Sequence, residues 1–348
     1  MGSPPSNPFA AAVRRLYRPL GFTKGYNVIL FFIFAGAMLT VCIARLKFFD
    51  FHGTMCGEGV GATLPGECYW YKKSLFAEIG IRIHLYGVLP AGILAVFQFI
   101  PAIRRKSITF HRVAGYISNV LVLIGTIGGF MIAGHSVGGG ADIQVAVWFL
   151  GIVVIIQLGL AMWNIKKLQI DQHRAWMLRA WFLLGTPITT RIILVFAAAI
   201  VTKQNNYLQT RHCEHIEFML QSATKTLEFY PECAAYFNGS NPDQHAIVRA
   251  SMDFNRVDQM SAALGTTFGM ALWLGMALQA AGIEIYLQLT PKESDRLRQI
   301  SYRKQMEAGY VSPGNAGLTA QSIGDANPFV PPAQRRAGLD TEKTPLLM

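Results

Sequence analysis

Histidine and arginine residues near the ends of apolar segments are the side chains best suited to chemistry. His111 is followed by Arg112, and His173 is followed by Arg174. Two neutral imidazoles from facing helices can bind a haem iron axially, and arginines at the membrane face can bind its propionates. We therefore expect a cofactor site at His111 and His173, for haem b or for a metal ion.

A second pair of histidines, His84 and His135, would form a site on the other membrane face. His111 and His135 lie at opposite ends of one predicted helix, farther apart than the ~30 Å of the hydrocarbon core. This separation disfavours a two-haem protein and favours the single site at His111 and His173. His84 stays a candidate ligand, and the alternative for all of these residues is an interfacial anchor.

Two arginines lie inside the fifth apolar run. Arg191 is near its centre, and Arg179 lies earlier. Charged side chains at membrane depth are costly and usually face the helix bundle or a cavity. Arg191 therefore either forms a structural salt bridge or carbonyl clamp, or binds an anionic group midway across the membrane. Arg179 can reach the cytosolic interface through its apolar stem.

Six apolar runs must position these side chains. Each is near the ~20 residues that a helix needs to cross the hydrocarbon. They cover residues 26–46, 79–101, 113–134, 145–164, 176–201 and 262–289. Composition agrees, since 52% of residues are hydrophobic and only 15% are charged, unlike an average soluble protein. The sequence predicts an all-α protein, a six-helix transmembrane bundle.

Lysine and arginine predict the orientation of this bundle, because basic residues in short loops stay on the cytosolic side. They gather in the N-terminal arm and in the loops near 102–112 and 165–174, so both termini are expected in the cytosol. The predicted parts are a cytosolic arm 1–25, five membrane helices within 26–201, an outer loop 202–261, a sixth helix 262–289 and a cytosolic tail 290–348. The composition of the tail predicts disorder after about 310.

The outer loops have four cysteines, which suits an oxidising compartment. We expect disulfides Cys56–Cys68 and Cys213–Cys233, although four cysteines allow three connectivities, and free thiols are the alternative. The same side has the glycosylation sequon Asn238-Gly239-Ser240.

The tails resemble sorting signals. Glu342 stands four residues before the pair Leu346-Leu347, as in acidic dileucine signals, and Asn-Pro-Phe tripeptides occur at 7–9 and 327–329. These patterns predict cytosolic sorting adaptors as partners beside the lipid bilayer. They favour an endosomal, vacuolar or plasma membrane location over the endoplasmic reticulum.

The net charge of +11 follows from the orientation, because basic residues gather on one side rather than on an aromatic-rich face. Nucleic acid is therefore not expected as a partner. The chain also lacks a phosphate-binding glycine motif of the Walker type, which argues against a nucleotide-driven pump. The oligomeric state stays open.

Several of these residues form a motif series. It comprises His84 with Gly87, Arg104-Arg105, His111-Arg112-x-x-Gly115 and His173-Arg174-x-Trp176-Met177-x-Arg179, followed by Arg191. This series resembles a family of predicted membrane proteins of bacteria and fungi, a domain of unknown function, over about residues 78–200. The resemblance implies a multi-pass fold and directs attention to these residues, but it implies no settled activity.

Three functions follow as hypotheses. The first is a haem- or metal-binding membrane oxidoreductase or electron carrier, which suits paired His-Arg residues at one membrane face. The second is a transporter of anions or small molecules that uses Arg191. The third is a non-catalytic scaffold whose tails bind adaptors.

Overall fold

The computed structural model describes residues 14–15, 17–57 and 63–331. Within them, six helical segments are long and apolar enough to cross a membrane, which confirms the predicted six-helix, all-α membrane architecture. The segments are Gly25–Phe49, Leu75–Gln98, Ile108–Ile132, Ala141–Lys166, Ile170–Gln204 and Val257–Gln288. The cytosolic location of the termini stays a prediction.

The chain forms two compact units. Unit 1 contains the described residues of Met1–Gly151 and Gly185–Gly275, and unit 2 contains Ile152–Leu184 with the described residues of Met276–Met348. Helices α7 (Ala141–Lys166) and α13 (Val257–Gln288) each contribute to both.

The fifth apolar run is divided rather than continuous. Helix α8 (Ile170–Leu184) ends before Gly185, and α9 (Thr186–Gln204) begins with a proline in its first turn. Proline suits the first turn of a helix but disrupts a helix interior, because it lacks the backbone N–H. Arg179 and Arg191 consequently lie on different helices.

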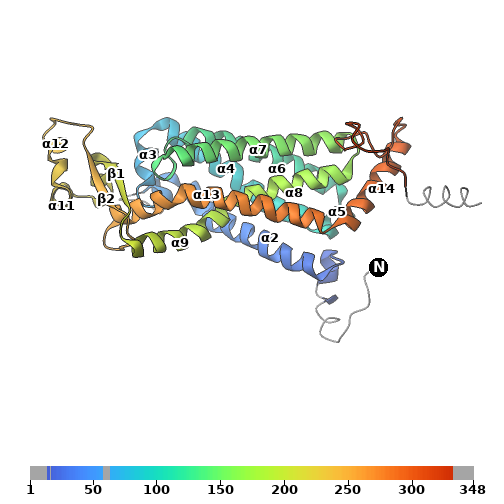
Figure 1. Cartoon of the computed structure of the whole chain (residues 1–348), viewed down its shortest axis with the longest axis horizontal. Helices are drawn as coiled ribbons and strands as arrows, with labels where there is room; N and C mark the ends of the chain where they lie inside the picture. The colour runs from blue at the N-terminus through green and yellow to red at the C-terminus, as the bar shows by residue number, and fades with distance from the viewer. Residues whose placement is uncertain (1–13, 16, 58–62, 332–348) are drawn as a thin grey trace, which may run out of the picture. The chain divides into compact units, whose positions relative to one another are not determined.

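The membrane part of unit 1 is built around α4 (Leu75–Gln98) and α6 (Ile108–Ile132), which run side by side (Figure 1). Helix α2 (Gly25–Arg45) packs against α4. Glycines bring the α4 and α6 backbones together, since a Cβ on Gly87 would lie only 2.5 Å from the backbone nitrogen of Gly125. Small residues at a helix interface allow this approach.

Shorter elements connect these helices. They are η1 (Arg18–Leu20), η2 (Leu46–Phe49), a π-helical turn η3 (Phe51–Met55), α3 (Glu67–Lys73), α5 (Pro101–Lys106) and η4 (Ser136–Gly138). Helix α3 immediately precedes α4, and η4 follows α6.

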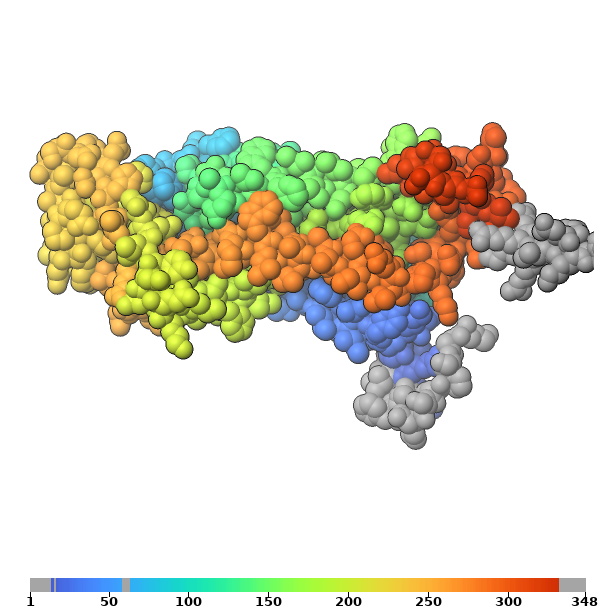
Figure 2. Space-filling model, in the orientation of Figure 1, coloured from blue at the N-terminus to red at the C-terminus, as the bar shows by residue number. Residues whose placement is uncertain are grey.

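The loop between α9 and α13 folds into a small α/β structure. It contains β1 (Leu208–His212), α10 (Cys213–Leu220), α11 (Ala223–Phe229), η5 (Pro231–Cys233), α12 (Ala234–Phe237) and β2 (His245–Arg249). The two strands pair antiparallel, with His212 opposite His245. In the space-filling view the yellow residues of this loop form a compact mass at one end of unit 1 (Figure 2).

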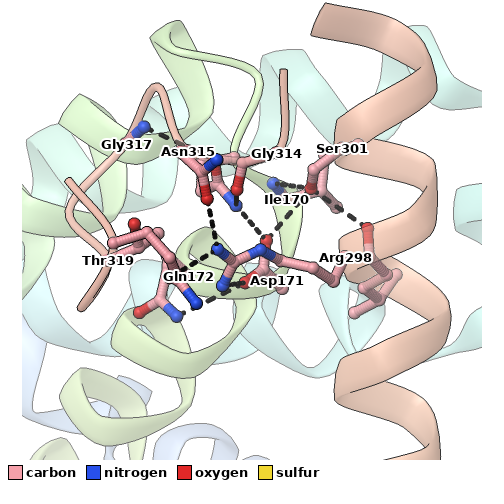
Figure 3. Close-up of polar contacts among 12 residues, drawn as sticks. Ile170, Asp171, Gln172, Arg298, Ser301, Gly314, Asn315, Gly317 and Thr319 are labelled. Carbon is pink, nitrogen blue, oxygen red and sulfur yellow. Dashed lines mark hydrogen bonds and ion pairs between the residues drawn. The ribbon is translucent and has the colours of Figure 1, made fainter. Parts of the chain in front are cut away.

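Unit 2 includes a buried polar network between α8 and α14 (Pro291–Glu307), shown in Figure 3. Ser301 donates to the Asp171 carboxylate at 3.0 Å and accepts from the backbone N–H of Ile170 at 2.8 Å. Arg298 lies 3.6 Å from the same carboxylate. The network thus provides hydrogen-bond partners for the buried Asp171 carboxylate and for a backbone N–H at the start of α8.

The segment after α14 is also described, through residue 331, although the composition predicts disorder after about 310. Its turns are fixed by amide side chains of unit 2. Gln169 donates to the carbonyl of Gly314 at 3.1 Å, and the Asn164 carbonyl accepts from the backbone N–H of Leu318 at 2.8 Å. Polar fixation of this kind leaves no hydrophobic pattern in the sequence.

We predict that Gly87→Val destabilises the protein, because the added side chain must displace the backbone of α6. Overpacking costs about 1–3 kcal/mol or more, so the thermal unfolding midpoint of the detergent-purified protein should fall by several degrees. The matched control is Gly36→Ala on α2, where an added Cβ meets no atom within 4 Å. Equal midpoints for Gly87→Val and wild type would contradict the close packing.

Candidate functional site

A cavity of about 310 Å³ lies among the connecting segments of unit 1. Its wall includes the rings of Trp70, His135, His212, His215 and His245 and the guanidinium of Arg211. We call it the disulfide-end cavity, because both disulfides lie in the segments that form it. Its volume is at the lower end of the range for small-molecule sites, ~300–1,000 Å³.

Helix α3 brings Trp70 to this cavity. The disulfide Cys56–Cys68, with Cα atoms 5.4 Å apart, ties α3 to the turn η3. The Trp70 ring stacks on His135, just after α6, with centroids 4.7 Å apart and planes 10° from parallel. The tryptophan face is therefore held against the turn that follows α6.

Helix α10 docks on α3 through polar contacts. The Tyr69 hydroxyl and the Lys73 ammonium both donate to the Glu214 carboxylate, at 2.7 and 2.5 Å. Burial raises the pKa of Tyr69 to about 12, with Glu214 adding to the shift. The disulfide Cys213–Cys233 fixes the start of α10.

His215 is the buried member of the histidine group. Its Nε2–H donates to the Gly66 carbonyl at 3.0 Å, and its ring stacks on Tyr69. Burial, together with the positive charge of Arg211, lowers the pKa of His215 to about 3. His215 is therefore a neutral wall residue at physiological pH.

His212 and His245 form a pair across β1 and β2. Their Nε2 atoms lie 3.2 Å apart, so the protonated Nε2 of one imidazole donates a hydrogen bond to the Nε2 of the other. Burial lowers the pKa of His212, and the positive charge that His245 can take up lowers it further. A pair that shares a proton at such a distance can take up or release a proton at the cavity.

Arg211 is a buried cation, with only 6% of its surface exposed. Its Nη2 donates to the Gln209 side chain at 3.0 Å and to the Ser261 carbonyl at 3.2 Å. Burial lowers the pKa of Arg211 to about 10, which leaves the guanidinium protonated at neutral pH. Among the described residues, no carboxylate forms an ion pair with it.

Of the histidines predicted from the sequence, His135 lines this cavity, whereas His84 and His173 lie elsewhere. In unit 1, the Nδ1–H of His84 donates to the Gly125 carbonyl at 2.8 Å. In unit 2, the Nδ1–H of His173 donates to the Ala161 carbonyl at 2.9 Å. This arrangement is also typical of metal-ligating histidines.

His111 lies in the first turn of α6 in unit 1, followed by the exposed Arg112. Residues 14–57 and 63–331, with residue 16 left out, contain no group of three or more histidine, cysteine or acidic side chains placed to hold a metal ion. Haem b or metal at His111 and His173 stays a prediction.

The two arginines of helix α8, Arg174 and Arg179, have partners on α13. Arg179 forms a two-pronged ion pair with Glu284, at 2.5 and 3.0 Å, and its guanidinium lies over the Trp176 ring. Arg174 donates to the Tyr286 hydroxyl at 3.3 Å. The His-Arg-x-Trp-Met-x-Arg segment thus connects α8 with α13.

Arg191, in unit 1, donates from Nη1 to the Pro187 carbonyl at 2.6 Å, one turn earlier in α9. Its charge also interacts with Glu67, whose pKa is raised by burial and partly lowered again by Arg191. These contacts correspond to the carbonyl clamp that the sequence allows.

The remaining predicted sites are placed as follows. The cysteine pairs are those expected, Cys56–Cys68 and Cys213–Cys233. Asn238 is exposed, and its side chain accepts from the backbone N–H of Ser240; its glycosylation stays a prediction. The sorting residues Glu342, Leu346 and Leu347, and the tripeptide at 7–9, lie outside the described residues.

Sequence reasoning singled out His135 but missed the other cavity residues, although the proximity of several of them to cysteines is a usable signal. Trp70 follows Cys68 by two positions, Arg211 and His212 directly precede Cys213, and His215 follows it by two. Each disulfide therefore fixes the polar residues that flank it.

The low pKa of His215 predicts pH-dependent stability. In the unfolded chain, histidine binds its proton near its ordinary pKa, about 6.5, whereas the folded protein excludes that proton down to about 3. Stability is therefore lost as pH falls through this window, by up to about 1.4 kcal/mol per pH unit.

The thermal unfolding midpoint should therefore decrease as the pH is lowered from about 7 to about 5. His215→Gln should reduce the dependence of the midpoint on pH. An unchanged dependence in His215→Gln would refute the assignment.

Comparison with known proteins places part of this chain in a family. The family model described as Predicted membrane protein (DUF2306) matches residues 81–212. The chain is also 21% identical to a protein from Aspergillus versicolor described as Ava biosynthesis cluster protein G, over 77% of this chain and 90% of that protein. No solved structure matches the chain. From within α4 to the last residue of β1, the chain is thus similar to the predicted membrane proteins of this family.

Proposed function

We propose that this multi-pass membrane protein binds a small organic molecule in the disulfide-end cavity and transfers a proton to or from it through His212 and His245. The observation that carries the proposal is the cavity itself, about 310 Å³ with four histidines, a tryptophan and an arginine in its wall. A concave site with a few converging polar groups beside aromatic rings is the usual form of a small-molecule site.

The histidine pair supplies the chemistry in this proposal. Acid–base catalysis needs a group that exchanges protons near neutral pH and lies within hydrogen-bond reach of the substrate. His245 is exposed and His212 is half-buried, and their Nε2 atoms share one hydrogen bond. Proton uptake by one ring can therefore be relayed to the other.

The relative from Aspergillus versicolor supports a small-molecule function, because it is named as a protein of a biosynthesis cluster. At 21% identity the two proteins need not share a substrate. For this chain we carry over only the class, an organic molecule made or modified by a biosynthetic reaction.

This proposal differs from the functions favoured by the sequence. A carrier that binds an anion midway would use Arg191, but the charge of that guanidinium interacts with the Glu67 carboxylate, whereas Arg211 has no acidic partner among the described residues. Neither His111 nor His173 lines the disulfide-end cavity, so an oxidoreductase at these two residues lacks the support that this cavity gives to a small-molecule site. A scaffold needs no histidine pair.

A cavity-filling variant tests the proposal. Thr210 lines the cavity on β1, and Leu208 is an exposed residue of the same strand outside the lining. We expect aromatic compounds, with indole as the first probe, to raise the thermal midpoint of wild type and Leu208→Trp but not of Thr210→Trp.

The histidine pair is tested in the same assay. His245→Gln should retain binding of the probe but change the pH dependence of binding, because His212 loses the imidazole with which it shares a hydrogen bond. Equal stabilisation of Thr210→Trp and wild type, or no stabilisation by any aromatic compound, would contradict a small-molecule site in this cavity.

A further inference from the structure

We infer that the molecule bound in the disulfide-end cavity presents an oxyanion, a carboxylate or a phosphate, to Arg211 and Trp70. This inference rests on the proposed function and specifies the class of its ligand. Two independent observations carry it, one from charge and one from hydrogen bonding.

The first observation is an uncompensated buried charge. Arg211 is 6% exposed, and among the described residues it donates to a neutral amide and a backbone carbonyl. Taking a charge out of water costs several kcal/mol unless an opposite charge or good hydrogen bonds offset the loss. Within 14–57 and 63–331, residue 16 apart, no acidic side chain supplies that opposite charge.

The neighbouring charges do not change this balance. Glu67 lines a small adjoining cavity together with Arg211, but among the described residues its carboxylate forms no ion pair with that guanidinium. Glu214 already accepts from both Tyr69 and Lys73. His215 stays neutral, and its low pKa is itself partly an effect of the Arg211 charge. The wall of the cavity is therefore positive on the side of Arg211.

The second observation is a pair of unsatisfied donors. The Nε atom of Arg211 and the Nε1 atom of Trp70 are both buried and lack a hydrogen-bond partner within the described part of the chain. Buried donors are almost always paired, so each exception needs an explanation. Both residues line the same cavity, so an anion bound there would lie beside two residues that each have an unpaired donor.

The shape of the wall adds a preference for a flat ring. Trp70 is stacked on His135 and lies edge-on to His215, so the lining is largely aromatic. Aromatic side chains pair favourably with other rings. An aromatic acid therefore matches the cavity better than inorganic phosphate does.

A matched pair of probes tests this inference on the purified full-length protein. Indole-3-acetate and indole-3-acetamide share ring and size but differ in charge. We expect the acetate to bind at least about tenfold more tightly, since hydrogen bonds to charged groups are worth about 1.5–3 kcal/mol. Arg211→Gln should bring the two affinities close together, whereas Arg211→Lys should retain part of the preference.

Two further variants keep the test decisive if Arg211→Gln does not fold. Trp70→Phe preserves the ring but removes the N–H donor, so it should weaken acetate binding several-fold. Lys225→Gln removes an exposed charge of the same loop outside the cavity lining, and it should bind both probes as wild type does.

The outcomes separate the inference from the proposed function. Equal binding of both probes to wild type would overturn the oxyanion inference and leave a neutral-ligand site. Failure of both probes to bind would overturn both proposals.

Two nanodisc compositions then distinguish the sources of the anion. If phosphatidic acid in place of phosphatidylcholine weakens acetate binding, the natural anion is a lipid phosphate. Unchanged binding would assign a small soluble acid instead.

Discussion

The close contact between α4 and α6 is the constraint on which the arrangement of unit 1 depends. Glycines on both helices let the backbones approach, and a Cβ on Gly87 would lie 2.6 Å from the Leu121 carbonyl. The start of α4 and the end of α6 both lead to the cavity, because α3 directly precedes α4 and η4 directly follows α6 in the chain. The stack of Trp70 on His135 is therefore positioned by helix packing in the membrane part.

The disulfides extend this order into the connecting segments. Cys68 holds α3 and Cys213 holds the start of α10, while Tyr69 and Glu214 join the two helices. Cross-links reduce the entropy of the unfolded loops, which adds to the stability that the buried cluster around Ile216, Met219 and Val248 gives this structure. The polar cavity wall is thus assembled from short segments that disulfides and hydrophobic packing hold in place.

The sequence predicts the membrane architecture well because a helix needs a long apolar run to cross a bilayer, and such runs are visible without a structure. The motif resemblance around His84 and His173 likewise located the family domain. The cavity could not be predicted in the same way, since Trp70, His135 and Arg211 come from three distant segments. The turns near Gly314 were missed because side-chain amides fix them.

The most direct test of this account is histidine footprinting. Purified protein would be treated with diethyl pyrocarbonate, with and without indole-3-acetate, and the modified residues identified by mass spectrometry. The account predicts that the probe protects His135, His212 and His245 together, whereas the exposed His52 remains reactive. Probe binding with unchanged reactivity of all three cavity histidines would contradict a ligand site at the disulfide end.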